Sequence, residues 1–62
     1  MIVHKLIEKI LPTQQIVICG ADFYYFLTTP AEMLNDYPDF LDREVEVINW
    51  SILFNAIMIS VI

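Results

Sequence analysis

The most regular pattern in the chain is the alternation of apolar and polar residues toward its C-terminus. Val45 and Val47 alternate with two glutamates, which predicts a half-buried strand with both valines on one face. Residues 56–62 are apolar on both faces and rich in β-branched side chains, so they predict a second strand that needs cover on two sides. We expect these strands to form a hairpin that closes near Phe54 and Asn55, since asparagine tolerates a left-handed backbone.

The N-terminal half shows helical periodicity followed by two strand-like runs. Apolar residues recur at helical spacing in residues 2–11, and Pro12 is expected to end this helix. Residues 15–19 and 23–27 predict two strands joined by a turn, in which Gly20 is expected to supply a positive φ. Alternation along the second strand places three side chains on one face, Phe23, Tyr25 and Leu27, with Tyr24 and Phe26 on the other.

The clearest local signal is the start of a second helix. Thr29 as N-cap, Pro30 at the first helical position and Glu32 three residues after the cap form a capping box. This helix is expected to end at residues 36–38, and residues 38–41 are expected to add one further helical turn.

The predicted elements follow the order α-β-β-α-β-β. This order predicts an α+β fold with a small antiparallel or mixed four-stranded sheet and with the helices on one face. The 62 residues form a single domain (1–62) near the lower size limit for a stable core, and the one cysteine, Cys19, excludes an internal disulfide. Because 58% of the residues are hydrophobic, we expect a homodimer or higher oligomer. The candidate dimer or interaction anchors are Tyr24, Trp50 and Phe54.

Acidic residues dominate the charge of the chain, which is −5 at pH 7. Six of the eight acids lie in one segment: Glu32, Asp36, Asp39, Asp42, Glu44 and Glu46. Only three lysine or arginine residues are present, which argues against direct nucleic-acid binding. The acidic segment has two interpretations, a solvated edge or a surface that recognises a basic region on another protein.

No residue pattern indicates catalysis, a cofactor or a metal site, and the predicted class is not an enzyme. His4 and Glu8 share a helical face, but two ligands do not make a zinc site. Cys19 ends an apolar strand, where it is expected to pack as a small hydrophobic residue rather than react. The aromatic run 23–26 lacks the basic neighbours that a nucleic-acid stacking platform requires.

The uncharged run 47–62 raises the question of membrane association. It is shorter than the roughly 20 residues of a membrane-spanning helix, and polar residues interrupt it. The N-terminus also lacks the pattern of a signal peptide. These features favour a cytoplasmic protein, and membrane association through this run is the alternative.

Four local motifs cover most of the chain: the turn 20–22, the capped segment 29–34, the strand lead-in 42–45 and the closing apolar strand. Together they resemble a loose group of small phage and prophage proteins that has no established common activity. The chain differs from that group at residues 48–54, which are mostly apolar where a polar turn is usual, and this indicates a contact surface. The resemblance implies an accessory protein that binds and blocks a host protein, including host defence enzymes. An oligomer that sequesters a ligand in a pocket between subunits is a third possibility.

Overall fold

The computed structural model describes residues 1–62 and alternates short helices with two β-hairpins. This is the predicted α+β order, with one 3₁₀ turn after the second helix. The elements are α1 (Val3–Ile7), β1 (Ile16–Gly20), β2 (Phe23–Thr28), α2 (Pro30–Asp36), η1 (Pro38–Phe40), β3 (Val45–Ser51) and β4 (Ala56–Val61).

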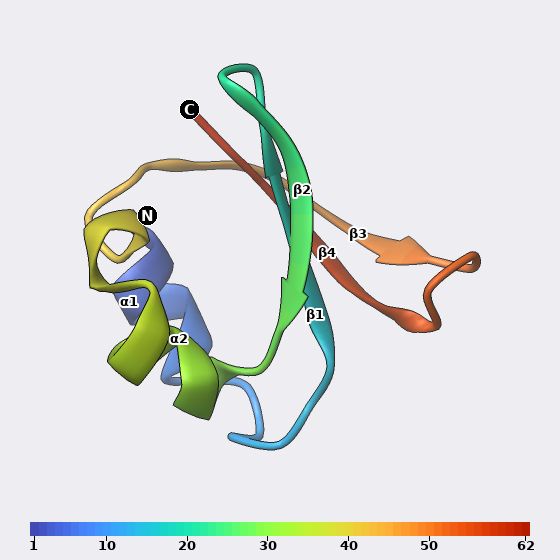
Figure 1. Cartoon of the computed structure of the whole chain (residues 1–62), viewed down its shortest axis with the longest axis horizontal. Coiled ribbons are helices and arrows are strands. Elements are labelled where there is room, and N and C mark those ends of the chain that lie inside the picture. The colour runs from blue at the N-terminus through green and yellow to red at the C-terminus, as the bar shows by residue number, and fades with distance from the viewer.

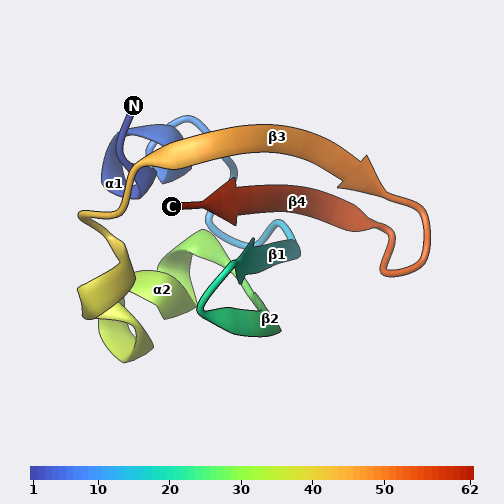
Figure 2. The ribbon, with the colours of Figure 1, turned by 90° about the horizontal axis from the view of Figure 1, so that it is seen from above.

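The four strands form one mixed sheet in the order β2-β1-β4-β3. Each hairpin is antiparallel, and the two hairpins meet through a parallel pairing of β1 with β4 at the centre. The edge strands are therefore β2 and β3. Both helices lie toward one end of the sheet, on one of its faces, and the β3–β4 hairpin extends away from them (Figures 1 and 2).

The predicted N-cap of α2 is confirmed, but the Glu32 carboxylate bonds to the Thr29 hydroxyl and not to the Thr29 backbone N–H of a full capping box. The Thr29 hydroxyl oxygen accepts a hydrogen bond from the Glu32 backbone N–H at 3.2 Å, and the Glu32 carboxylate accepts one from the same hydroxyl at 3.2 Å. Pro30 occupies the first turn of the helix. Backbone N–H groups in this turn have no acceptor within the helix, so the lack of an N–H on proline costs no hydrogen bond there. Local sequence alone therefore fixes where this helix begins.

The first helix is shorter than the periodicity of residues 2–11 predicts. It ends at Ile7 rather than at Pro12, and Leu11 is 72% exposed. The backbone N–H groups of Lys9 and Ile10 bond to carbonyl groups three residues earlier, which marks a tight turn instead of a continuing α-helix. Ile10 still packs against the core from this turn, so its core contact does not require the helix to continue.

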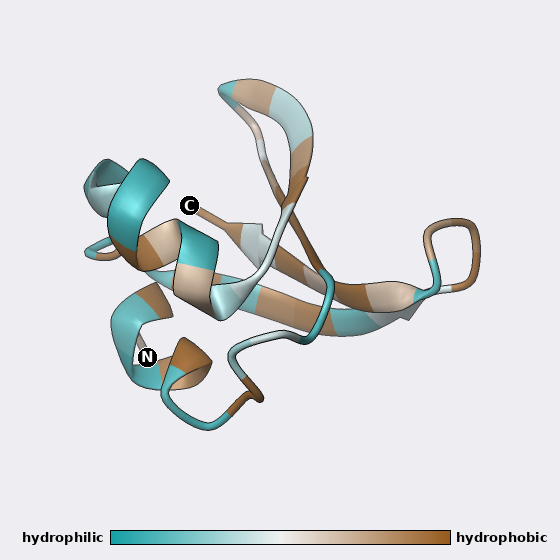
Figure 3. Ribbon diagram, turned by 60° about the horizontal axis from the view of Figure 1, so that its bottom comes forward, coloured by the Kyte–Doolittle hydropathy of each residue, from teal (hydrophilic) through white to brown (hydrophobic).

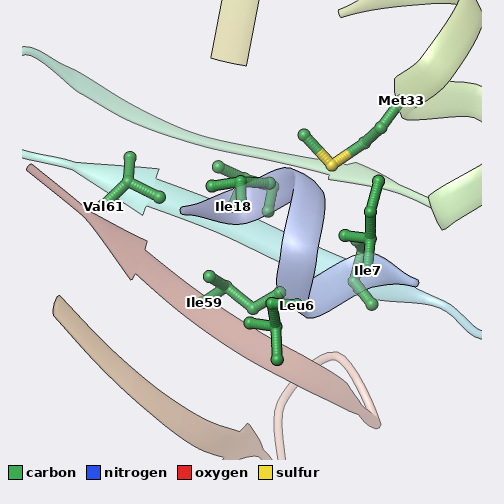
Figure 4. Close-up of a cluster of buried hydrophobic side chains, with 8 residues drawn as sticks. Leu6, Ile7, Ile18, Met33, Ile59 and Val61 are labelled. Carbon is green, nitrogen blue, oxygen red and sulfur yellow. The ribbon is translucent and has the colours of Figure 1, made fainter. Parts of the chain in front are cut away.

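The hydrophobic core lies between the helices and the sheet (Figure 4). Its buried cluster consists of Val3, Leu6, Ile7, Ile16, Ile18, Met33, Ile59 and Val61. An aromatic group from β2, η1 and the residue before η1 packs beside it. In that group Phe26 stacks on Tyr37 with ring centroids 4.3 Å apart, and Phe40 meets Phe26 edge to face at 5.0 Å. Such pairs contribute about 0.5–1.5 kcal/mol each beyond their area burial.

A β-bulge between Cys19 and Gly20 corrects the predicted faces of β2. Gly20 pairs with Phe23, whereas Cys19 pairs with Tyr25, so one extra residue of β2 is accommodated. As a result Phe23 and Phe26 both pack against the core, and Tyr25 does not.

Gly20 is required for space and not for its φ angle. The predicted positive φ is wrong, because no glycine of the chain has one. A Cβ atom on Gly20 would lie 2.7 Å from a ring carbon of Phe23 and 3.1 Å from the carbonyl oxygen of Val61. Sequence reasoning identified the residue but assigned it the wrong physical role.

Replacing Gly20 with alanine should destabilise the domain by about 1–3 kcal/mol, because the Phe23 ring is packed and has to move. Ala21→Ser, at an exposed position of the same turn, is the matched control and should change stability by less than about 0.5 kcal/mol. Urea denaturation measures both. Equal stability of Gly20→Ala and the wild type would contradict the close approach at this position.

A second bulge, in β3, corrects the predicted faces of its valines. Val45 pairs with Val61 and packs against the core, whereas Val47 pairs with Ser60. Ser60 and Val61 are consecutive in β4 and point to opposite faces, so Val45 and Val47 also point to opposite faces. The predicted hairpin itself is confirmed, and Asn55 adopts the expected left-handed backbone with φ 52°.

Candidate interaction surface

The β3–β4 hairpin carries the most exposed group of large apolar side chains near its turn. Ile52 is 89% exposed and Leu53 is 85% exposed, while Trp50 and Ile48 are each about half exposed. Figure 3 shows the loop that projects from the sheet as predominantly hydrophobic. We call these four residues, Ile48, Trp50, Ile52 and Leu53, the hairpin patch.

The turn is built so that two of its side chains point outward. The Ser51 hydroxyl oxygen accepts a hydrogen bond from the Phe54 backbone N–H at 3.2 Å, and the left-handed Asn55 follows directly. Phe54 packs on Tyr25 with ring centroids 5.1 Å apart, which orders the turn. Ile52 and Leu53 take no part in this packing, so their exposure is not explained by the folding of the chain.

The three predicted anchors lie in different environments. Trp50 is part of the hairpin patch, and Phe54 is half-buried against Tyr25. Tyr24 is 93% exposed, but it lies beside the β1–β2 turn. Because β1 runs parallel to β4, that turn is at the opposite end of the sheet from the β3–β4 turn. The structure therefore joins Trp50 to Ile52 and Leu53 and leaves Tyr24 apart from them.

The acidic segment runs from α2 through η1 to the start of β3, and all six of its predicted residues are exposed. Two of them have intramolecular roles: Glu32 completes the helix cap, and a Glu44 oxygen lies 2.5 Å from the N-terminal ammonium. The other four, Asp36, Asp39, Asp42 and Glu46, form no ion pair. These four carboxylates remain available to a basic partner.

Arg43, the one basic residue within the acidic segment, is used inside the fold. Its guanidinium donates two hydrogen bonds to the Asp22 carboxylate, at 2.9 and 2.7 Å. The same group lies over the rings of Phe23 and Phe40, at 5.5 and 5.0 Å from their centroids. This contact ties the β1–β2 turn to the segment before β3. Sequence reasoning missed it, because the two residues are far apart along the chain.

The Arg43 guanidinium holds the pKa of the Asp22 carboxyl below its usual range, mainly by hydrogen bonding. A carboxyl whose pKa is lower in the folded state adds stability above its ordinary pKa, and this contribution disappears as the pH falls through the lowered value. Asp22→Asn should therefore destabilise the domain more near pH 7 than near about pH 2, because acid protonates the wild-type carboxyl and weakens its bond to Arg43. Urea titrations at the two pH values measure this, and a difference that does not shrink in acid would contradict the ion pair.

The remaining polar candidates show ordinary contacts. Cys19 Sγ lies 3.3 Å from Ser60 Oγ and 3.8 Å from the Ile59 carbonyl oxygen. His4 Nε2 lies 3.8 Å from Glu8 Oε1, with both side chains about half exposed. No group of three or more His, Cys, Asp or Glu residues lies close enough to hold a metal ion.

An open depression lies where β1 and β4 end, beside the Asp22–Arg43 pair, with a volume of about 410 Å³. Cys19, Glu46 and Ser60 contribute to its lining, and its one basic group is held by Asp22. No helix of the structure combines the length and the apolar character needed to cross a membrane.

Comparisons with protein-family models, with curated proteins and with solved structures found no match to this chain. The resemblance to small phage proteins thus stays a prediction.

Proposed function

We propose that the chain is a small non-catalytic module that binds another protein through the hairpin patch. The observation that carries this proposal is the exposure of Ile52 and Leu53 at the end of a projecting hairpin whose turn is otherwise ordered. A few residues buried at the centre of an interface contribute most of its binding free energy, and tryptophan is enriched among them. Trp50 beside these two residues supplies such an anchor.

The partner has a basic region beside an apolar site. Four exposed carboxylates without ion pairs attract such a region and orient it before contact, because charges at the rim of an interface mainly set the association rate. By resemblance to phage accessory proteins, the partner is a host protein in the cytoplasm that binding blocks, and a host defence enzyme is one class of such target.

Affinity capture from a host lysate tests this function with three forms of the chain. They are the wild type, the Ile52→Ser/Leu53→Ser double variant and the Leu11→Ser variant. Leu11 is the matched control because it is also exposed, at 72%, and lies outside the hairpin. We expect one protein to be retained by the wild type and the control and to be lost with the double variant. Retention by all three forms would refute the role of the hairpin patch.

The alternative is that the same apolar side chains bind a membrane surface. Cosedimentation of the chain with lipid vesicles tests this alternative alongside the capture experiment. The chain carries a net charge of −5, so anionic lipids repel it. We expect no cosedimentation with neutral or anionic vesicles. Cosedimentation that the double variant abolishes would assign the hairpin patch to a membrane and overturn the proposal.

Reversing charge in the acidic segment should slow association with the partner more than it changes dissociation. Asp39→Lys/Asp42→Lys removes two of the carboxylates without ion pairs, and the remaining attraction weakens with salt because the Debye length is about 8 Å at 0.15 M. Trp50→Ala should act in the opposite way and speed dissociation. Surface plasmon resonance at two salt concentrations measures both rates. Association rates independent of salt and of the charge reversal would identify the segment as a solvated edge.

A further inference from the structure

The outer edge of β3 is only partly covered by the chain itself. Residues Met1–Val3 run beside its beginning: the Val45 N–H bonds to the Met1 carbonyl at 2.8 Å, and the Val3 N–H bonds to the Arg43 carbonyl at 2.9 Å. Ile2 and Glu44 form a β-bridge there. Beyond the bulge, residues 47–51 pair with β4 on one side and with nothing on the other.

This uncovered stretch lacks the usual features that keep edge strands apart. Natural edge strands commonly carry lysine, proline or an inward-pointing charge, which prevents pairing with a second strand. Residues 47–51 contain none of these, and the nearest charged residue along the chain is Glu46 at the bulge. The backbone donors and acceptors on this side are therefore open to strand addition.

We propose that the free edge of β3 pairs with the same edge of a second copy of this chain, antiparallel and centred on Asn49. The two four-stranded sheets then become one continuous sheet related by a two-fold axis. A strand from an unrelated partner is the other possible occupant, and the self-complementary exposed side chains of β3 favour the second copy.

The charges of the chain select the antiparallel arrangement. Centring the pair on Asn49 leaves the two copies of Glu46 six residue positions apart along the strands, which is about 20 Å. A parallel pairing of the two edges would place Glu46 next to Glu46 of the partner subunit. Like charges at this distance repel, and no basic residue of β3 compensates for them. The stretch that pairs is itself uncharged, so the net charge of −5 on each copy remains outside the contact.

The side chains of the free edge are self-complementary in this register. Ile48 lies opposite Trp50 of the partner subunit, and by symmetry Trp50 lies opposite the partner subunit's Ile48. Ile48 pairs with Ile59 and Trp50 with Ile57 in β4, so the two project from the same side of the sheet. An aromatic side chain opposite a β-branched one is a favourable cross-strand pair. Both residues are about half exposed in the single chain; edge pairing covers the side that faces the neighbouring strand and leaves the outer surface of the sheet face open to the partner protein.

If the proposed function holds, the dimer also brings together the two parts of the binding surface. Within one chain the acidic segment leads into the start of β3 and Ile52 follows its end, so a strand of seven residues, about 23 Å, separates them. In the antiparallel dimer the turn of each copy lies beside the bulge at Glu46 of the other, next to the N-terminal residues that cover the start of β3. Apolar anchor and acidic rim then belong to one surface, which neither copy forms alone.

Sedimentation velocity of the full chain over about 1–100 μM, comparing Ile48→Lys with Leu34→Lys, tests the dimer. Ile48 and Leu34 are both 51% exposed, and Leu34 lies on α2, away from the edge. We expect the wild type and Leu34→Lys to sediment as dimers. For Ile48→Lys we expect a dimer dissociation constant at least tenfold higher, with circular dichroism used to check that the variant is folded. A wild type that stays monomeric, or a dimer that Ile48→Lys leaves intact, would overturn the inference.

A crosslinking experiment checks the register in case Ile48→Lys does not fold. In a Cys19→Ser background, Asn49→Cys should give a covalent dimer with a short bis-maleimide linker, because the two copies of this residue face each other. Glu46→Cys should not, since its two copies lie about 20 Å apart. Crosslinking at position 46 and not at position 49 would refute the arrangement. These outcomes do not depend on the captured partner, so failure of the dimer and failure of the proposed function are distinguishable.

Discussion

Replacing Ile59 with alanine should leave a large fraction of the chains unfolded at 37 °C. Ile59 is fully buried in the central strand β4 and belongs to the main core cluster (Figure 4). Truncating a buried isoleucine to alanine destabilises a protein by about 2–5 kcal/mol, because the lost apolar contact leaves a cavity. A domain of this size has a stability of only about 3–5 kcal/mol, so this one change removes most of it.

Ile52→Ala is the matched control, because it makes the same chemical change at a position that is 89% exposed. Its effect on the free energy of unfolding should stay within about 0.5 kcal/mol. Thermal and urea denaturation followed by circular dichroism compare the two variants. If Ile59→Ala unfolds at the wild-type temperature while Ile52→Ala does not, the assignment of buried and exposed positions is wrong.

The Ile52→Ser/Leu53→Ser variant should bind the captured partner at least about 100-fold more weakly than the wild type. If both residues are hot spots of the interface, truncating each costs at least about 2 kcal/mol, and each 1.4 kcal/mol is a factor of ten in affinity. The same variant should retain wild-type stability, since both side chains are more than four-fifths exposed in the free chain. Loss of binding with unchanged stability is the signature of a contact surface.

Titration calorimetry with the purified partner measures this effect, and Leu11→Ser is again the control for removing an exposed apolar side chain elsewhere. The control should bind within about twofold of the wild type. A double variant that keeps wild-type affinity, or a control that loses as much, would show that binding does not depend on the hairpin patch.

Features set by neighbouring residues could be predicted from the sequence. The cap formed by Thr29, Pro30 and Glu32 depends on atoms within four residues, and the structure has the predicted N-cap. The left-handed Asn55 at the hairpin turn is a preference of the same local kind. Two strand pairs and two helices in this order then leave few arrangements other than an α+β layer structure, which is the fold observed.

Features set by contacts between distant residues could not be predicted in this way. The bulge in β3 arises from its register against β4, and it reverses the faces that simple alternation gives to Val45 and Val47. The end of α1 at Ile7 and the pairing of Arg43 with Asp22 depend on which segments the fold brings together. The mostly apolar run 48–54 indicated a contact surface, which stays a prediction, and the degree of exposure at Ile52 and Leu53 became known only with the path of the hairpin.

The architecture separates the parts that hold the fold from the parts that are free to bind. The core cluster lies between the helices and one face of the sheet. The turn of the β3–β4 hairpin extends away from the helices (Figures 1 and 2). Substitutions at the end of this hairpin therefore change the surface without removing core contacts. This separation makes the binding experiments interpretable, because affinity and stability are expected to respond to different residues.

Hydrogen–deuterium exchange of the chain with and without its captured partner tests the central claim most directly. If the hairpin patch is the contact surface, binding should slow exchange at the backbone amides of residues 50–55 and leave those of α1 unchanged. Slower exchange at α1 and α2, with the β3–β4 turn still exchanging at the rate of the free chain, would contradict it.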